Sequence, residues 1–252
     1  MKRKHIIALL CALLCGSANV MAQKYKLTGI EREQIVIDNR YADDAKGAEF
    51  LKPYKAKVDS VMSPVVGTSA KYMRSHAPES ELSNLLSDIM VWGGKIYAET
   101  PDIGLYNLGG IRAALPAGVV TYGDILNIAP FENKICFLTL NGEQLTNLFR
   151  RLGKGHGTGV SKGLKVVYKD RELVSITYNG EPVTADKTYR IATIDYLIQG
   201  NDGYKELRNG SMLVSPRDAY ANTRNIIADY FREKAAAGEQ VDAQIEGRVV
   251  SE

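Results

Sequence analysis

YNLGGIRAALPAGVVTYGDILNIAPFEN, residues 106–133, is the stretch around which we expect the rest of the chain to fold. An apolar run at 103–106 leads into it and predicts a short buried strand. The chain then breaks at the glycine pair 109–110. Further on, Thr121 with Asp124 predicts a capping box that opens a short helix.

The polar and aromatic side chains of this stretch suit a flat ligand with an anionic end. Arg112 offers a cation for a phosphate or carboxylate, although such an arginine equally often ties its loop to a nearby acid. Gly109 and Gly110 let backbone N–H groups approach a ligand closely. Asn107 adds a carboxamide, and Phe131, which follows a proline, is either a stacking platform or a core residue.

A second polar, glycine-bearing loop, DYLIQGNDGY at 195–204, follows a predicted strand at 188–194. Within it, Tyr196 and Asp202 offer an aromatic ring and a carboxylate that can accept from hydroxyl groups. The alternative interpretation is an ordinary turn, which this loop motif favours when it is considered by itself.

The first residues predict export. Lys2, Arg3 and Lys4 precede an apolar core at 6–14 and a small-residue cleavage site ending at Ala22, which is the pattern of a secretory signal peptide. The apolar core is too short to span a membrane. We expect cleavage near residue 22 and a periplasmic product, with a lipid anchor through Cys15 as the weaker alternative.

The remaining chain, residues 23–252, gives no compositional reason to expect a nucleic-acid or membrane partner. Of the 32 Lys and Arg residues, three lie in the predicted signal, so 29 basic and 29 acidic residues remain. Cys136 is then the sole cysteine; it lies in an apolar run and is predicted to be a buried thiol without a disulfide. This length suits one large domain without a transmembrane segment.

Apolar periodicity predicts interleaved helices and strands. Because hairpins occur among them, the expected fold class is mixed α+β in a single domain rather than a purely parallel sheet. The expected strands are a short pair within 26–39 and the runs 103–106, 135–140, 164–168, 173–178, 188–194 and 248–250. The expected helices are 48–62, 77–92, one capped by Asn141 and Gln144, and 218–237.

The chain beyond residue 22 lacks the usual signatures of a catalytic centre. Its two histidines, His76 and His156, form no Asp-x-His or His-x-x-x-His pattern, which argues against a transition-metal site with several histidine ligands. It also contains neither a Gly-x-Ser-x-Gly elbow nor a P-loop. The residues therefore indicate binding more than catalysis.

Three motifs in this order, NLGGIR (107–112), APFEN (129–133) and DYLIQGNDGY (195–204), resemble the C-terminal substrate-binding domain of the 5′-nucleotidase / UDP-sugar hydrolase family. PESELSNLLSDIM and the closing EGRV are similar to that domain too, so the resemblance covers about 58–250. It implies an α+β domain in α/β/β/α layers. In the family this domain follows a dimetal phosphoesterase domain that carries the catalysis.

The resemblance also implies roles for individual residues. Asn107 and Arg112 would contact the phosphate end of a nucleotide, Phe131 and Tyr196 would sandwich the base, and Asp202 would accept from the ribose hydroxyls. Stacking of this kind contributes about 1–3 kcal/mol per base with little discrimination among bases. The candidate substrate-binding residues are Asn107, Gly109, Gly110, Arg112, Phe131, Asn133, Tyr196 and Asp202.

The sequence departs from the family pattern at three positions. Pro78 stands where an arginine is frequent at the start of the second helix, and the nearby Arg74 is a possible substitute. Asn201 stands where glycine is usual, which would narrow the ribose pocket. Tyr196 stands where phenylalanine is common, so its hydroxyl needs a partner.

These observations favour an exported nucleotide-binding subunit that acts in nucleotide catabolism. It would bind a nucleoside 5′-phosphate or a nucleoside, hold no cofactor itself, and rely on a separate metallophosphoesterase chain that contains the divalent metals. Two alternatives remain: a stand-alone module that scavenges nucleosides or nucleotides, and a catalytically dead scaffold for protein contacts.

Overall fold

The computed structural model describes residues 26–153, 155 and 157–252, in two compact units divided after Glu49. The predicted signal peptide, Cys15 and His156 lie outside the described residues. In the first unit, residues 26–37 form no strand, so the strand pair expected within 26–39 is wrong. Alternating apolar residues favour an extended backbone, but a strand also requires ladder hydrogen bonds to a neighbour.

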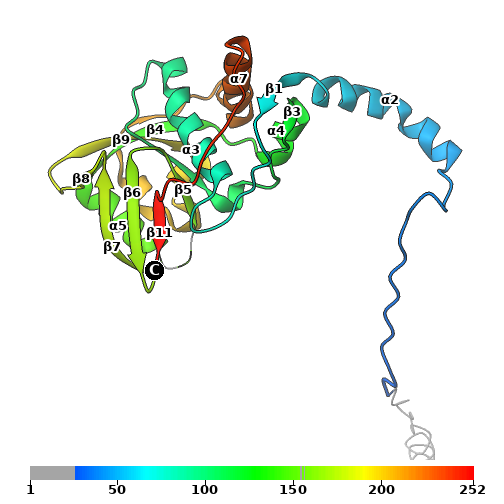
Figure 1. The fold of residues 1–252 in the computed structure, drawn as a ribbon, viewed down its shortest axis with the longest axis horizontal. Helices are drawn as coiled ribbons and strands as arrows, with labels where there is room; N and C mark the ends of the chain where they lie inside the picture. The colour runs from blue at the N-terminus through cyan, green and yellow to red at the C-terminus, as the bar shows by residue number, and fades with distance from the viewer. Residues whose placement is uncertain (1–25, 154, 156) are drawn as a thin grey trace, which may run out of the picture. The chain divides into compact units, whose positions relative to one another are not determined.

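The second unit, Phe50–Glu252 (Figure 1), is built on a mixed five-stranded sheet. Its strand order is β10-β4-β9-β2-β5. The long central strands β4 and β9 are antiparallel, with Ile135 opposite Ile194 and Asn141 opposite Thr188. β9 and β2 are parallel, which brings their carboxyl ends to the same edge of the sheet. The strands are β2 (Ile103–Asn107), β4 (Ile135–Asn141), β5 (Thr158–Val160), β9 (Thr188–Ile194) and β10 (Ser211–Val214).

Two smaller sheets complete the second unit. The predicted hairpin is confirmed as β6 and β7, whose turn residues Asp170 and Arg171 both have positive φ, as a tight hairpin turn requires. The strands are β6 (Leu164–Lys169), β7 (Glu172–Tyr178), β8 (Glu181–Pro182) and β11 (Val249–Ser251) in the order β11-β6-β7-β8, and β1 (Val65–Ser69) with β3 (Gly118–Thr121).

Side-chain caps set where the main helices begin. The predicted capping boxes at Thr121 and Asn141 are confirmed. A third box, at Ser80, starts its helix at Glu81 rather than at the expected residue 77. Likewise the last helix begins at Thr223, after the cap Asn222, rather than at 218. The helices are α3 (Glu81–Gly93), α4 (Tyr122–Ile128), α5 (Gly142–Leu152), α6 (Asp195–Ile198) and α7 (Thr223–Ala236).

Short 3-10 turns complete the list: η1 (Gly94–Tyr97), η2 (Leu108–Gly110), η3 (Asn201–Gly203), η4 (Lys205–Asn209) and η5 (Ala219–Ala221). The core includes the space between the five-stranded sheet and α3, and buried residues of α5 and α7 also belong to it. Gly104 of β2 allows this close packing, because a Cβ there would lie 2.0 Å from the Ser87 carbonyl oxygen of α3. Cys136 is buried, as predicted. The mixed α+β class is confirmed.

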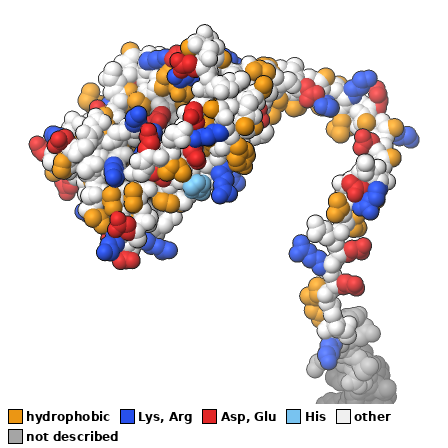
Figure 2. Space-filling view, viewed as in Figure 1, with side chains coloured by type: hydrophobic (Ala, Val, Ile, Leu, Met, Phe, Trp, Pro, Cys, Tyr) orange, Lys and Arg blue, Asp and Glu red, His pale blue; other side chains and the backbone are white. Residues whose placement is uncertain are grey.

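Charges of both signs are interspersed over the visible face of the second unit (Figure 2). No helix in the described part of the chain is long and apolar enough to cross a membrane. The helix predicted at 48–62 is confirmed as α2 (Ala45–Met62), but none of its residues is buried.

Candidate functional site

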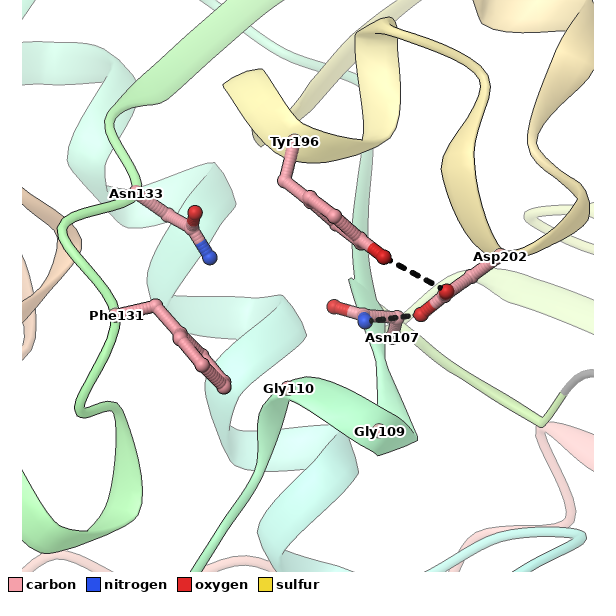
Figure 3. A pocket seen from close by; sticks show the side chains of 7 residues that line it. All are labelled: Asn107, Gly109, Gly110, Phe131, Asn133, Tyr196 and Asp202. Atoms are coloured by element: carbon pink, nitrogen blue, oxygen red, sulfur yellow. Dashed lines mark hydrogen bonds between the residues drawn. The ribbon is translucent and has the colours of Figure 1, made fainter.

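Seven of the eight candidate residues line one cavity of about 310 Å³ at the carboxyl ends of β2 and β9. The ring of Phe131 reaches into it from the loop after α4 and the ring of Tyr196 from α6, and Asp202 lies at one end (Figure 3). The lining residues are Asn107, Gly109, Gly110, Phe131, Asn133, Tyr196 and Asp202.

Asn107 is held at the end of β2 by its surroundings. It is only 3% exposed, and its Nδ2 donates a 2.6 Å hydrogen bond to Oδ2 of Asp202. The turn η2 follows at once, and a Cβ on Gly110 would lie 2.7 Å from Oδ1 of Asn107. Because Gly110 has no side chain, the carboxamide of Asn107 has room to lie beside it.

The loop between α4 and β4 presents Phe131 and Asn133. Phe131 is 47% exposed, so the alternative of a core residue is wrong. The backbone of this loop is anchored where the carbonyl of Asn133 accepts from the amide of Thr223 at 2.9 Å, at the start of α7. That contact fixes the loop while leaving the aromatic ring free for a ligand.

Helix α6 presents Tyr196, and the turn η3 that follows it presents Asp202. Tyr196 is 37% exposed, and its hydroxyl donates to Oδ1 of Asp202 at 3.0 Å. This hydrogen bond to a carboxylate raises the pKa of the Tyr196 phenol. The extra hydroxyl noted in the sequence thus has a partner, and it links the ring to the acid.

Asn201 and Pro78, two of the departures from the family pattern, are not among the residues that line this cavity. The side chain of Asn201 donates to the carbonyl of Tyr196 at 2.8 Å and is not among the residues that line the cavity, so it does not narrow the pocket. Pro78 lines a separate cavity of about 220 Å³ together with Tyr168 and Val249.

Arg112 is the one candidate residue outside the lining. Its side chain is exposed, and Nη1 donates to the carbonyl of Gly109 at 3.3 Å, so the guanidinium lies beside the loop that forms one wall. Arg74 is exposed too. Among the described residues that line the cavity, Asp202 supplies the one carboxylate, and none carries a positive charge.

The cavity therefore combines apolar rings with hydrogen-bond acceptors. Oδ1 of Asn107 is buried and has no hydrogen-bond partner among the described residues. An unpaired buried acceptor costs about 1–3 kcal/mol, so a ligand N–H or O–H group at this position would be favourable. Asp202 supplies two further acceptor oxygens, each with lone pairs to spare.

No group of three or more His, Cys, Asp or Glu side chains is placed to hold a metal ion in the described ranges, which leave out 1–25, 154 and 156. Sequence reasoning found every lining residue. It did not predict the two hydrogen bonds that join Asp202 to Asn107 and to Tyr196. The one indication of them in the sequence was the tyrosine hydroxyl, which needs a hydrogen-bond partner.

Comparisons with known proteins find relatives of this chain. A sequence model described as "5'-nucleotidase, C-terminal domain" matches residues 65–209. Relatives include "Silent protein UshA(0)" of Salmonella typhimurium, 22% identical over 84% of this chain and 38% of that protein. A "5'-nucleotidase" of Vibrio cholerae is 21% identical over 88% of this chain and 39% of that protein.

Solved structures show the same fold. The 5′-nucleotidase precursor of Thermus thermophilus superposes with a TM-score of 0.69 at 24% identity, over 82% of this chain and 43% of that one. The NAD nucleotidase of Haemophilus influenzae gives 0.62 at 19% identity, over 83% of this chain and 42% of that one. This chain thus spans about two-fifths of the length of these proteins.

Proposed function

The chain belongs to the family of 5′-nucleotidase C-terminal domains, and we propose that its cavity binds the nucleoside part of a nucleoside 5′-phosphate. One observation carries this proposal: two exposed rings, Phe131 and Tyr196, border a cavity that ends in the acceptors of Asn107 and Asp202. A base is flat and stacks on aromatic rings, whereas ribose hydroxyls donate hydrogen bonds.

The charges around the cavity suggest how the ligand lies. A ribose at the Asp202 end would donate to that carboxylate and to Oδ1 of Asn107. The phosphate would avoid the negative lining and lie toward Arg112, whose guanidinium is hydrogen-bonded to the Gly109 wall. An arginine at that rim can pair with a phosphate bidentately.

We assign catalysis to a separate chain. This chain covers 38% of a curated relative, and its described residues include no metal-binding group. The function that fits is an exported, periplasmic subunit of a two-chain 5′-nucleotidase, residues 23–252 forming its binding domain. The divalent metals would belong to the partner phosphoesterase.

Calorimetric titration of residues 23–252 with adenosine and with AMP, both metal-free, tests the proposal. We expect saturable binding of both, tighter for AMP, and an Arg112→Ala variant that binds AMP no better than adenosine. The nucleoside-binding proposal fails if neither ligand binds, with or without a phosphoesterase present. Binding without any gain of hydrolysis on mixing with a phosphoesterase would favour the stand-alone module.

A further inference from the structure

Helix α2 gains little stability from packing against other described parts of the chain. It spans 18 residues, contains Pro53 in its interior, and buries none of its side chains. Most of the stability of a helix in a protein comes from the packing of its apolar face, and an interior proline removes one backbone hydrogen bond. A helix of this kind normally depends on packing against another surface.

The end of α2 is fixed to the rest of the second unit. The amide of Tyr122 donates to the carbonyl of Pro64 at 2.8 Å, just after the helix. At the start of α4, a Cβ on Gly123 would lie 3.0 Å from the carbonyl oxygen of Met62. The last turn of α2 is therefore packed, while the preceding turns stay uncovered.

One face of α2 is apolar. Positions 50, 54, 58 and 61 fall on the same side of a helix with 3.6 residues per turn. The α2 stripe consists of Phe50, Leu51, Tyr54, Val58 and Val61, each more than half exposed. Two of its rings, Phe50 and Tyr54, pack together with centroids 5.7 Å apart. A contiguous exposed apolar surface of this kind marks an interaction site.

Lysines flank the α2 stripe on both sides. By helical spacing, Lys57 lies next to Val61 and Lys55 lies next to Leu51. Lys55 pairs with Asp59 at 2.8 Å, on the polar side of the helix. Pairing with a second α2 would bring lysine edges against lysine edges in either orientation, which disfavours a self-dimer. An apolar groove with acidic edges is the complementary surface.

We propose that the α2 stripe docks the separate phosphoesterase chain through such an acidic-edged apolar groove. This inference rests on the proposed function. The family is described as a C-terminal domain, and the matched relatives are much longer than this chain, so in them further protein precedes this domain. Here α2 directly precedes the family match, which begins at Val65.

The test uses residues 23–252 and the exported phosphoesterase of the same genome that carries Asp-x-His and Gly-Asn-His motifs, mixed in a calorimeter. We expect a 1:1 complex whose Kd rises about tenfold or more in the Phe50→Asp/Tyr54→Asp variant. Lys57→Glu should weaken binding about threefold and reduce its salt dependence. Val174→Asp, at a similarly exposed apolar site on β7, is the matched control and should change nothing.

Unchanged affinity in the double variant, or no complex at all, overturns the docking proposal. It is also overturned if the unmodified chain forms an α2-dependent dimer in light scattering, or binds phosphatidylglycerol-containing vesicles through α2. The variants should melt at the same temperature as the unmodified chain, since α2 buries no side chain. Adenosine titration of each variant reports separately on the cavity, so a failed docking surface and a failed binding site give different results.

Discussion

The carboxamide of Asn107 donates a 2.6 Å hydrogen bond to the carboxylate of Asp202, although 95 residues separate them in the chain. The other oxygen of the same carboxylate accepts from the hydroxyl of Tyr196. One acid thereby joins the end of β2 to the aromatic ring on α6. The walls of the cavity are a connected unit, so a change at one residue should be felt at the others.

Asn107→Ala should weaken adenosine binding about tenfold to a hundredfold. It removes a donor to a charged acceptor, worth about 1.5–3 kcal/mol, together with the unpaired Oδ1 acceptor. Calorimetry measures the change. Asn127→Ala, at an exposed position on α4, is the control and should bind normally. Normal binding by Asn107→Ala would contradict the assigned ribose contacts.

The double variant Phe131→Ala/Tyr196→Ala should bind adenosine at least tenfold more weakly. Each ring contributes about 1–3 kcal/mol if it stacks on the base. The fold should survive, since both side chains are substantially exposed. Tyr72→Ala, which removes an exposed ring outside the cavity lining, is the comparison. Equal affinities for these two variants would rule out stacking.

Arg112→Ala should weaken the binding of AMP about tenfold and leave adenosine unaffected, because the guanidinium lies outside the cavity lining and can meet only the phosphate end. Raising the salt concentration should reduce the difference between the two ligands. Arg74→Ala separates a specific contact from a general effect of positive charge. Should Arg74→Ala reproduce the whole loss, the phosphate position assigned to Arg112 is wrong.

Arg248→Met should lower the free energy of unfolding by about 3 kcal/mol, because it removes the buried cation that pairs with the carboxylate of Asp88. Arg248 is 6% exposed. Its guanidinium donates to both oxygens of Asp88 at 2.8 Å and to the carbonyl of Val160 at 3.0 Å. Urea unfolding measures the loss, with the exposed Arg150→Met as control. A loss no larger than that of the control would contradict a stabilising role.

Stability should fall steeply above pH 10. Burial raises the pKa of Tyr106 to about 12, and it also raises the pKa values of Tyr168 and Tyr204. In the unfolded chain a tyrosine has a pKa of about 10. Below pH 10 both states hold these protons. Above it the unfolded state binds fewer protons than the folded state, so unfolding becomes easier as pH rises.

Urea midpoints between pH 9 and pH 11 measure this effect. Tyr106→Phe should reduce the slope of unfolding free energy against pH by about 1.4 kcal/mol per unit above pH 10, because one group no longer titrates. The exposed Tyr72→Phe should leave the slope unchanged. A Tyr106→Phe slope equal to that of the unmodified chain would mean that the buried phenol does not control alkaline unfolding.

Much of the fold could be predicted from sequence patterns whose residues lie close together in the chain. The capping boxes at Thr121 and Asn141 start their helices because the cap and the third helical residue meet across one turn. The strand predicted at 188–194 is β9 to the residue. By contrast, the pattern at 26–39 gave the wrong prediction, since strand formation depends on a neighbouring strand.

The sequence by itself determined the residue types of the cavity, because its motifs specify glycine turns, rings and acceptors at short spacings. Only the tertiary structure decided how they combine. Packing of β2 beside β9 brings Asn107 to Asp202. The fold also leaves Phe131 exposed rather than in the core and Arg112 outside the lining. Such pairings depend on contacts between residues far apart in the chain, and no local pattern encodes their distances.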